Sequence, residues 1–195
     1  MAIALNGTGS ITGVSVGGLP DGIVDTDTLA ANAVTSAVLP AGSVLQVAQG
    51  TFTTKTTTTS ATYVDTGLSV SITPTSSSSK VFIMTSFLFG QTRDPVLTQN
   101  NMKSFTLVRD STDLAPGNSR FFAHQDQASG NINWAEQTQI CAINFLDSPS
   151  TTSATTYKLQ MKTDFSGTEI YFNTRANGNG DHQGSSTIIA MEVAG

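Results

Sequence analysis

From Gly42 to the C-terminus, the hydrophobic residues of this chain recur with a period of two, and turn-forming residues interrupt them at short intervals. Leu68, Val70 and Ile72 alternate with serines, the pattern of a strand that buries one face and exposes the other. Pro74 ends that pattern, and a serine run follows it. Short strands separated by such turns are typical of sandwiches and jelly rolls. We therefore expect an all-β, antiparallel, jelly-roll-like sandwich.

Further strands are expected wherever the alternation resumes between turn signals. They cover residues 44–52, 80–89, 104–109, 137–146, 155–162, 168–173 and 187–193. The threonine-rich stretch 54–60 fits either an exposed strand edge or a loop. The final strand runs almost to the C-terminus, so we expect the end of the chain to lie in a sheet.

The stretch 80–89 is apolar on both of its faces. The two sets are Phe82, Met84 and Leu88 on one face, and Val81, Ile83, Phe87 and Phe89 on the other. A strand with two apolar faces is buried from both sides. Either it lies inside a sandwich, or another subunit covers its outer face.

The chain changes character near residue 42, which predicts an N-terminal segment 1–42 and a sandwich domain 43–195. The first segment is rich in Gly, Ala and Thr and has no aromatic residue, so it cannot form a packed core alone. It can become ordered if three copies bury its small apolar side chains against one another or against a larger neighbour. The residues that would be buried in this way are Ile11, Val14, Val16, Leu19, Ile23 and Val24.

A short helix at 26–38 is one interpretation of the end of this segment, and an extended connector is the other. Asp25, Thr26 or Asp27 supplies a helix cap, and Pro40 supplies a stop. In the helical form, one apolar stripe would offer contacts between the three copies of a stem. It consists of Leu29, Ala33 and Ala37.

Charge excludes several classes of partner. Only 12% of the residues are charged, the net charge is −5, and Lys and Arg form no cluster. Nucleic-acid binding needs a basic patch to neutralise phosphates, so neither a nucleic acid nor an anionic membrane surface is an expected partner. The first ten residues have no basic region or long apolar core, and no apolar run approaches 18 residues, so we expect neither a signal peptide nor membrane insertion.

No catalytic, cofactor-binding or metal-binding motif is visible. The chain has two histidines, scattered acidic residues, and no GxGxxG, P-loop or HExxH motif, so we expect no enzyme and no cofactor. The loop that begins at Asn177 lacks the acidic residues of a calcium loop. The alternative is a single ion on a threefold axis, held by one ligand from each of three chains. Cys141 is expected to be a small buried hydrophobe, because no histidine can be placed beside it.

Two aromatic and amide-rich stretches, 120–127 and 131–136, are interpreted as loops. Aromatic faces and amides suit a glycan or a protein surface, and the alternative is that Phe121, Phe122 and Trp134 pack into the domain. Because function concentrates on loops held by a rigid scaffold, the candidate contact residues lie there and in two later turns. They are Arg120, His124, Trp134, Arg175 and His182.

Several stretches resemble one family of proteins. GIVDTDTLAANAVTSAVLPAGSVLQV is similar to the repetitive stems of phage fibres, and LPAGSVLQV before a threonine-rich strand resembles the junction of stem and head in cyanophage-like tail-fibre proteins. GLSVSITPTSSSSKVFIM, FTLVRDST, FLDSPSTTSATTYKLQ and SSTIIAMEVAG resemble the C-terminal domains of such fibres. The resemblance runs from about residue 22 to the end, and it implies a homotrimer with an extended stem and compact heads. The chain is much shorter than typical fibres.

The resemblance implies a structural protein of a phage virion. In one form it is a short trimeric tail fibre with two further copies of itself as partners. The small apolar residues of segment 1–42 are then candidate virion-anchoring residues that bind another virion protein. The candidate contact residues of the head are then candidate host-contact residues that bind a host surface glycan or protein. In the other form it is a head fibre or capsid decoration protein. A carbohydrate-active enzyme is disfavoured, because no convincing pair of carboxylates is present.

Overall fold

The computed structural model describes residue 34 and residues 38–91, 101–115, 120–126, 138–164, 169–175 and 183–195. Almost all of them belong to one compact unit, Leu39–Gly195, and Val34 and Val38 belong to a second unit, Met1–Val38. The sites expected in the N-terminal segment lie outside the described residues. These are Ile11, Val14, Val16, Leu19, Ile23, Val24, Leu29, Ala33 and Ala37, with most of the expected helix at 26–38.

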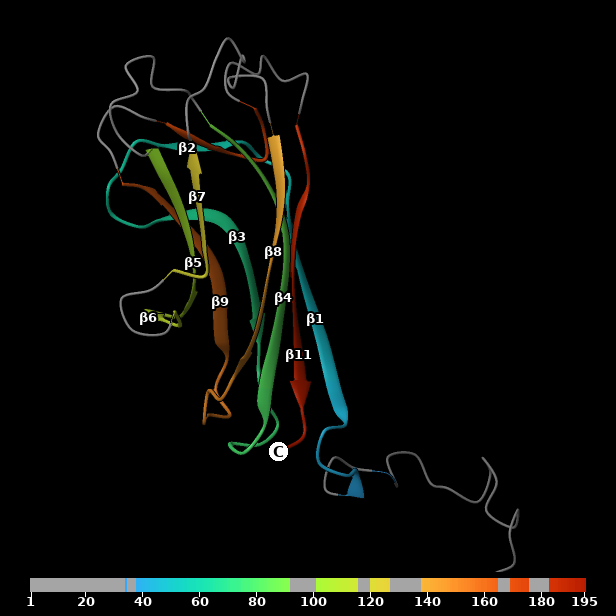
Figure 1. The fold of residues 1–195 in the computed structure, drawn as a ribbon. Coiled ribbons are helices and arrows are strands. Elements are labelled where there is room, and N and C mark those ends of the chain that lie inside the picture. The colour runs from blue at the N-terminus through green and yellow to red at the C-terminus, as the bar shows by residue number, and fades with distance from the viewer. Residues whose placement is uncertain are drawn as a thin grey trace, which may run out of the picture. The chain divides into compact units, whose positions relative to one another are not determined.

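The described residues form eleven β-strands and no α-helix, which confirms the all-β expectation. The strands are β1 Val44–Phe52, β2 Thr56–Thr58, β3 Val64–Ile72, β4 Lys80–Gln91, β5 Asn101–Arg109, β6 Thr112–Asp113, β7 Phe122–Asp126, β8 Thr138–Asp147, β9 Thr155–Thr163, β10 Ile170–Phe172 and β11 Ser186–Val193. They build two antiparallel sheets that face each other (Figure 1). Sheet A has the order β1-β11-β4-β10-β2, with β8 also paired to β4; sheet B has the order β3-β9-β5-β6, with β7 also paired to β5.

The long strands pair in a nested order. β5 pairs with β7, β4 with β8, β3 with β9 and β1 with β11, each pair enclosing the previous one in the sequence. This is the pairing of one long hairpin wound into two layers, β1-β11-β4-β8 and β3-β9-β5-β7. The sandwich is therefore a jelly roll, as the sequence predicts.

The core lies between the two sheets and is rich in phenylalanine. The rings of Phe87 and Phe105 lie 4.7 Å apart between centroids, and those of Phe89 and Phe105 lie 5.1 Å apart. Phe122 packs edge-on against Phe89 at 5.8 Å, and Phe172 stacks on Phe87 at 6.1 Å. Tilted and edge-on arrangements of this kind are the favourable ones for aromatic rings. The cluster joins β4 and β10 of sheet A to β5 and β7 of sheet B.

The prediction of a loop at 120–127 is wrong in part, because residues 122–126 form β7. Only Phe122 directs an apolar side chain into the core, so the segment shows no apolar alternation. Its strand conformation comes from pairing with the polar end of β5, in which Asn101 lies opposite Asp126 and Phe105 opposite Phe122. Phe121 and Phe122 pack into the domain, as the alternative interpretation of these rings expected.

A buried carboxylate ties the two sheets together at one end of the sandwich. Asp147 of β8 accepts hydrogen bonds from the Arg109 guanidinium at 2.7 and 2.8 Å and from the Tyr157 hydroxyl at 2.7 Å. Both donors belong to sheet B. Burial and the neighbouring Asp147 carboxylate raise the pKa of Tyr157 far above its usual value, so its hydroxyl remains a donor at neutral pH.

A second buried carboxylate, Glu192 of β11, holds the connection between β3 and β4. It is fully buried and accepts hydrogen bonds from Gln46 Nε2 at 2.6 Å, from the Thr75 backbone N–H at 2.7 Å and from the Thr75 hydroxyl at 2.8 Å. Burial alone would raise the pKa of Glu192, but these hydrogen bonds outweigh it and lower the pKa below 4.5.

The sandwich is expected to lose stability in acid partly through Glu192. The pKa of Glu192 is lower in the folded state than in the unfolded state. Its ionised carboxylate therefore contributes fully to the free energy of unfolding above the unfolded-state pKa of about 4.3. This contribution disappears as the pH falls through the pKa of the folded state. Glu192→Gln, which keeps the shape and removes the charge, should cost about 1–3 kcal/mol at pH 7 and flatten the acid side of the stability curve. Urea unfolding between pH 3 and pH 7 measures this. Equal pH dependence in both proteins would contradict the prediction.

Candidate interaction surface

The outward-facing side chains of sheet A form a surface that is almost entirely apolar or hydroxyl-bearing. In each of its four long strands, alternate residues point to the core and the others point outward. We call the outward residues of the central part of these strands the outer face of sheet A; Lys80 and Val193 at one end of the strands and Thr138 at the other also point outward and lie beyond it. It comprises Val47, Gln49 and Thr51 of β1, Thr187, Ile189 and Met191 of β11, Phe82, Met84, Ser86 and Leu88 of β4, and Ile140, Ala142, Asn144 and Leu146 of β8.

Strand register aligns these side chains in rows across the sheet. Val47 lies opposite Met191, Met191 opposite Phe82, and Phe82 opposite Leu146, so one apolar row crosses all four strands. A second row places Ile189 beside Met84. Cross-strand neighbours of this kind have Cβ atoms about 5 Å apart, so they form one continuous surface.

Much of this surface is exposed in the single chain. Ile140 is 76% exposed, Val47 60%, Leu146 49% and Met84 37%, values that are unusual for large hydrophobic side chains. None of the fourteen side chains of the outer face carries a charge, and the exposed Lys80 at the start of β4 lies at its border. A contiguous apolar surface of this kind marks a contact with another molecule.

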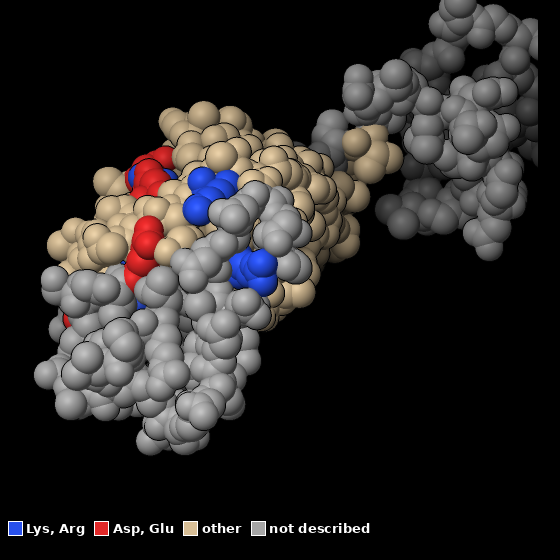
Figure 2. All heavy atoms as spheres, turned by 90° about the horizontal axis from the view of Figure 1, so that it is seen from above, with Lys and Arg blue, Asp and Glu red and all other residues tan. Residues whose placement is uncertain are grey.

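The outward side of sheet B has the opposite character. Its strands β3 and β9 present serine, threonine, glutamine and charged side chains, and Lys158 forms an ion pair with Asp65 at 2.9 Å. Figure 2 shows charged side chains on the left and centre of the described domain and none on its right-hand part, the side on which β1 and β11 lie in Figure 1. The two faces of the sandwich are therefore built for different surroundings.

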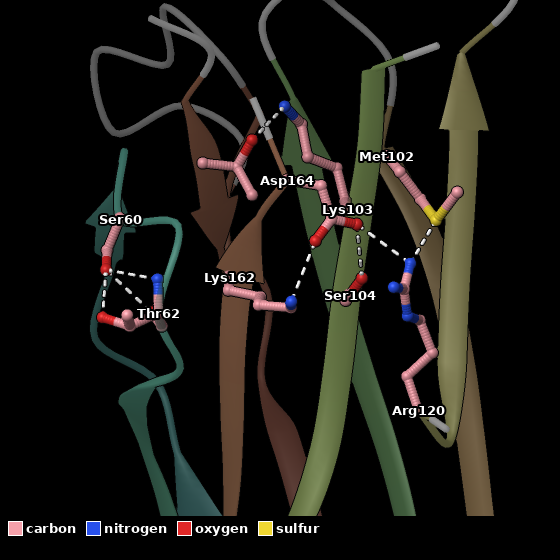
Figure 3. Close-up of polar contacts among 9 residues, drawn as sticks. Ser60, Thr62, Met102, Lys103, Ser104, Arg120, Lys162 and Asp164 are labelled. Atoms are coloured by element: carbon pink, nitrogen blue, oxygen red, sulfur yellow. Dashed lines mark hydrogen bonds and ion pairs between the residues drawn. The ribbon is translucent and has the colours of Figure 1, made fainter. Parts of the chain in front are cut away.

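A polar cluster lies where β5 and β9 meet the segment before β7 (Figure 3). Asp164 accepts from Arg120 at 2.9 Å, from Lys162 at 2.9 Å and from the Ser104 hydroxyl at 3.2 Å. Burial alone would raise the pKa of Asp164, but the hydrogen bond and charge of Lys162 and the charge of Arg120 outweigh it and lower the pKa. Arg120 also contacts the Met102 sulfur. The carboxylate is satisfied by its own neighbours, so the cluster fastens the segment before β7 to sheet B.

The five expected host-contact residues are placed as follows. Arg120 belongs to the polar cluster, and the main chain of His124 pairs with Lys103 within sheet B. Arg175 follows β10 of sheet A and is partly exposed. Trp134 and His182 lie outside the described residues, as does the side chain of His124. Arg120 thus lies next to a strand of sheet B, and Arg175 follows a strand of sheet A.

Neither a metal site nor a reactive thiol emerges from the described part of the chain. Within it, no group of three or more His, Cys, Asp or Glu side chains is close enough to hold an ion, and no helix is long and apolar enough to cross a membrane. Cys141 is half-buried on β8, and burial raises the pKa of its thiol to about 11, so it is protonated at neutral pH.

Comparison with known proteins defines neither a family nor a function. No family model matches the chain, and no curated protein matches it. Two structures of infectious bursal disease virus are similar to 77% of it, those of the Gt strain (12% identity, TM-score 0.37) and the Gx strain (14%, 0.35). The chain spans 38% and 37% of those two chains. Structural similarity this weak supports no conclusion about the family or the function of this chain.

Sequence reasoning found only the part of the outer face that belongs to β4. The same signal, hydrophobic residues on both faces of a strand, is present in β8 and β11. Ile140 and Leu146 flank the buried Ile143, and Ile189 and Met191 flank the buried Ala190. What periodicity could not show is that these strands are neighbours in one sheet.

Proposed function

We propose that this protein is a structural component of a virus particle and acts as a trimer whose sandwich domains pack together through the outer face of sheet A. The proposal rests on one observation: the outer face of sheet A is exposed, apolar and uncharged in the single chain. Copies of one chain offer such a face to one another without any buried charge to desolvate.

In its finer form, the proposal is a short tail fibre of a bacteriophage. The segment 1–42 anchors the trimer to another virion protein, and the sandwich domains contact a glycan or protein of the host surface. A threefold arrangement presents three equal contacts at once, so a weak single contact becomes a firm attachment through avidity. The resemblance of the stem and head stretches to phage fibres supports this form.

The polar side chains of the domain support a structural role without catalysis. Asp147, Asp164 and Glu192 each accept hydrogen bonds from two or more neighbours and connect strands or segments to one another. A catalytic carboxylate needs access to a substrate. Asp147 and Glu192 are buried, and their oxygen atoms accept hydrogen bonds from residues that hold the fold together.

Two measurements test the proposal. Analytical ultracentrifugation of the full chain at micromolar concentration is expected to show a three-chain species, and a well-folded monomer would overturn the trimer. Electron microscopy with labelled antibodies is expected to place the protein on the virion tail. Label on the head would instead assign it as a head fibre or capsid decoration, and no label on the particle would overturn the virion role.

A further inference from the structure

The outer edge of β8 is built differently from the two other long edge strands, β1 and β3. β8 pairs with β4 over ten consecutive residues, Thr138 to Asp147, without a register shift. On its other side, no strand of the described chain pairs with it. Its backbone therefore presents a long and regular row of donors and acceptors along that side.

Sheet edges are normally protected, because an open edge pairs with other chains. β1 has a register shift between Val44 and Gln46, and β3 has one after Asp65, whose charge lies at the edge of sheet B. β8 has no shift and no proline, and its single charged residue is Asp147 at the very end. Such an edge is expected to be covered in the assembled protein.

The backbone direction shows which residues of β8 are free to pair. The Ile143 N–H donates to the Thr85 hydroxyl at 3.0 Å, and the Ile143 carbonyl accepts from that hydroxyl at 3.3 Å, so the backbone groups of Ile143 point toward β4. Backbone groups alternate sides along an antiparallel strand. Those of Ile140, Ala142, Asn144 and Leu146 therefore point to the open edge.

We propose that β8 pairs with β8 of a second copy, in antiparallel fashion, around a twofold axis at Ile143. In this register Ile140 lies opposite Leu146 of the second copy, and Ala142 lies opposite Asn144. The outward backbone groups of Ile140, Ala142, Asn144 and Leu146 then meet those of the same four residues in the second copy. The two exposed hydrophobic side chains, 76% and 49% exposed, cover each other at both ends of the pairing. The strand is thus complementary to itself.

This contact is separate from the trimer of the proposed function. It uses the backbone edge of β8 and, of the outer face of sheet A, only Ile140 and Leu146 at its border, whereas the trimer uses the face as a whole, with Val47, Met84 and Met191 on the other three strands. A twofold contact cannot form within one threefold trimer, so in a particle it would join chains of neighbouring trimers. Either contact can therefore fail without the other.

A register-specific disulfide tests the pairing. In full-length protein that also carries Cys141→Ser, the double variant Ile140→Cys with Leu146→Cys places two thiols opposite each other across the axis. Residues in a hydrogen-bonded antiparallel pair have Cα atoms about 5.5 Å apart, within the range for a disulfide. Mild oxidation is expected to give a covalent two-chain species.

The single variants are the matched controls. With Ile140→Cys or Leu146→Cys alone, the nearest thiols of the two copies lie six residues apart along the strands, about 20 Å, and no disulfide should form. A covalent pair from the double variant alone supports the register. Equal cross-linking in all three variants, or none in the double variant, would overturn it.

A backbone variant gives a second readout. Ala142→Pro removes an N–H that points to the open edge, so the pairing with β4 stays intact and the domain should fold. Ala142→Ser keeps that N–H and is the control. Ala142→Pro is expected to weaken the β8–β8 association, which joins trimers into larger species, at least tenfold in sedimentation equilibrium, while circular dichroism stays unchanged. Undiminished association of folded Ala142→Pro would count against the pairing.

Discussion

Replacing Gly50 with alanine is expected to destabilise the sandwich by about 3 kcal/mol or more, because there is no room for a side chain. A Cβ atom there would lie 1.9 Å from the Ser69 carbonyl oxygen and 3.0 Å from Cγ2 of Ile188. The first contact is with backbone, which cannot move aside as a side chain can. β1 of sheet A and β3 of sheet B would have to separate at this point.

Gly42→Ala is the matched control for this prediction. Gly42 has a φ of +89° but nothing within 4 Å of the added Cβ, so its substitution should cost only the backbone term of about 1–2 kcal/mol. Thermal melting followed by circular dichroism compares the two variants. For a domain of this size, 3 kcal/mol corresponds to roughly 6–12 °C in Tm. If the Gly50→Ala protein had the same Tm as the wild type, the two sheets would not approach each other this closely.

Much of the fold follows from the sequence because the strands are short and well punctuated. Strand β1 begins and ends where predicted, and β9 and β11 agree to within one residue, since their alternation is clear and turn residues bound them. Alternation reports on one strand and its two faces, so it defines elements well. It carries no information on which strand lies beside which.

The features that sequence reasoning missed all depend on such long-range neighbours. β7 is a strand because β5 is beside it, and Gly50 is required because Ser69 of the opposite sheet is near. The outer face of sheet A is one surface only because β1, β11, β4 and β8 lie in that order. The apolar residues on both faces of 80–89 were visible in the sequence, and the structure shows that the outward apolar surface continues across three more strands.

Placing two carboxylates on the outer face of sheet A is expected to prevent trimer formation without unfolding the chain. Val47 and Met84 are 60% and 37% exposed in the single chain, so Val47→Glu with Met84→Glu should leave the domain folded. In a trimer the new charges would be buried without partners, at a cost of several kcal/mol. The dissociation constant should rise at least about 100-fold, which corresponds to about 2.7 kcal/mol. Sedimentation equilibrium over a concentration series measures it.

The same change on the other sheet is the control. Ser69 and Ser71 point outward from β3 on sheet B and are exposed, so Ser69→Glu with Ser71→Glu adds the same charge to a face that already carries charged side chains. This variant is expected to assemble as the wild type does. If both double variants assemble normally, contacts between copies would have to come from segment 1–42, and the outer face of sheet A would need another partner. If both dissociate, net charge rather than burial would control assembly.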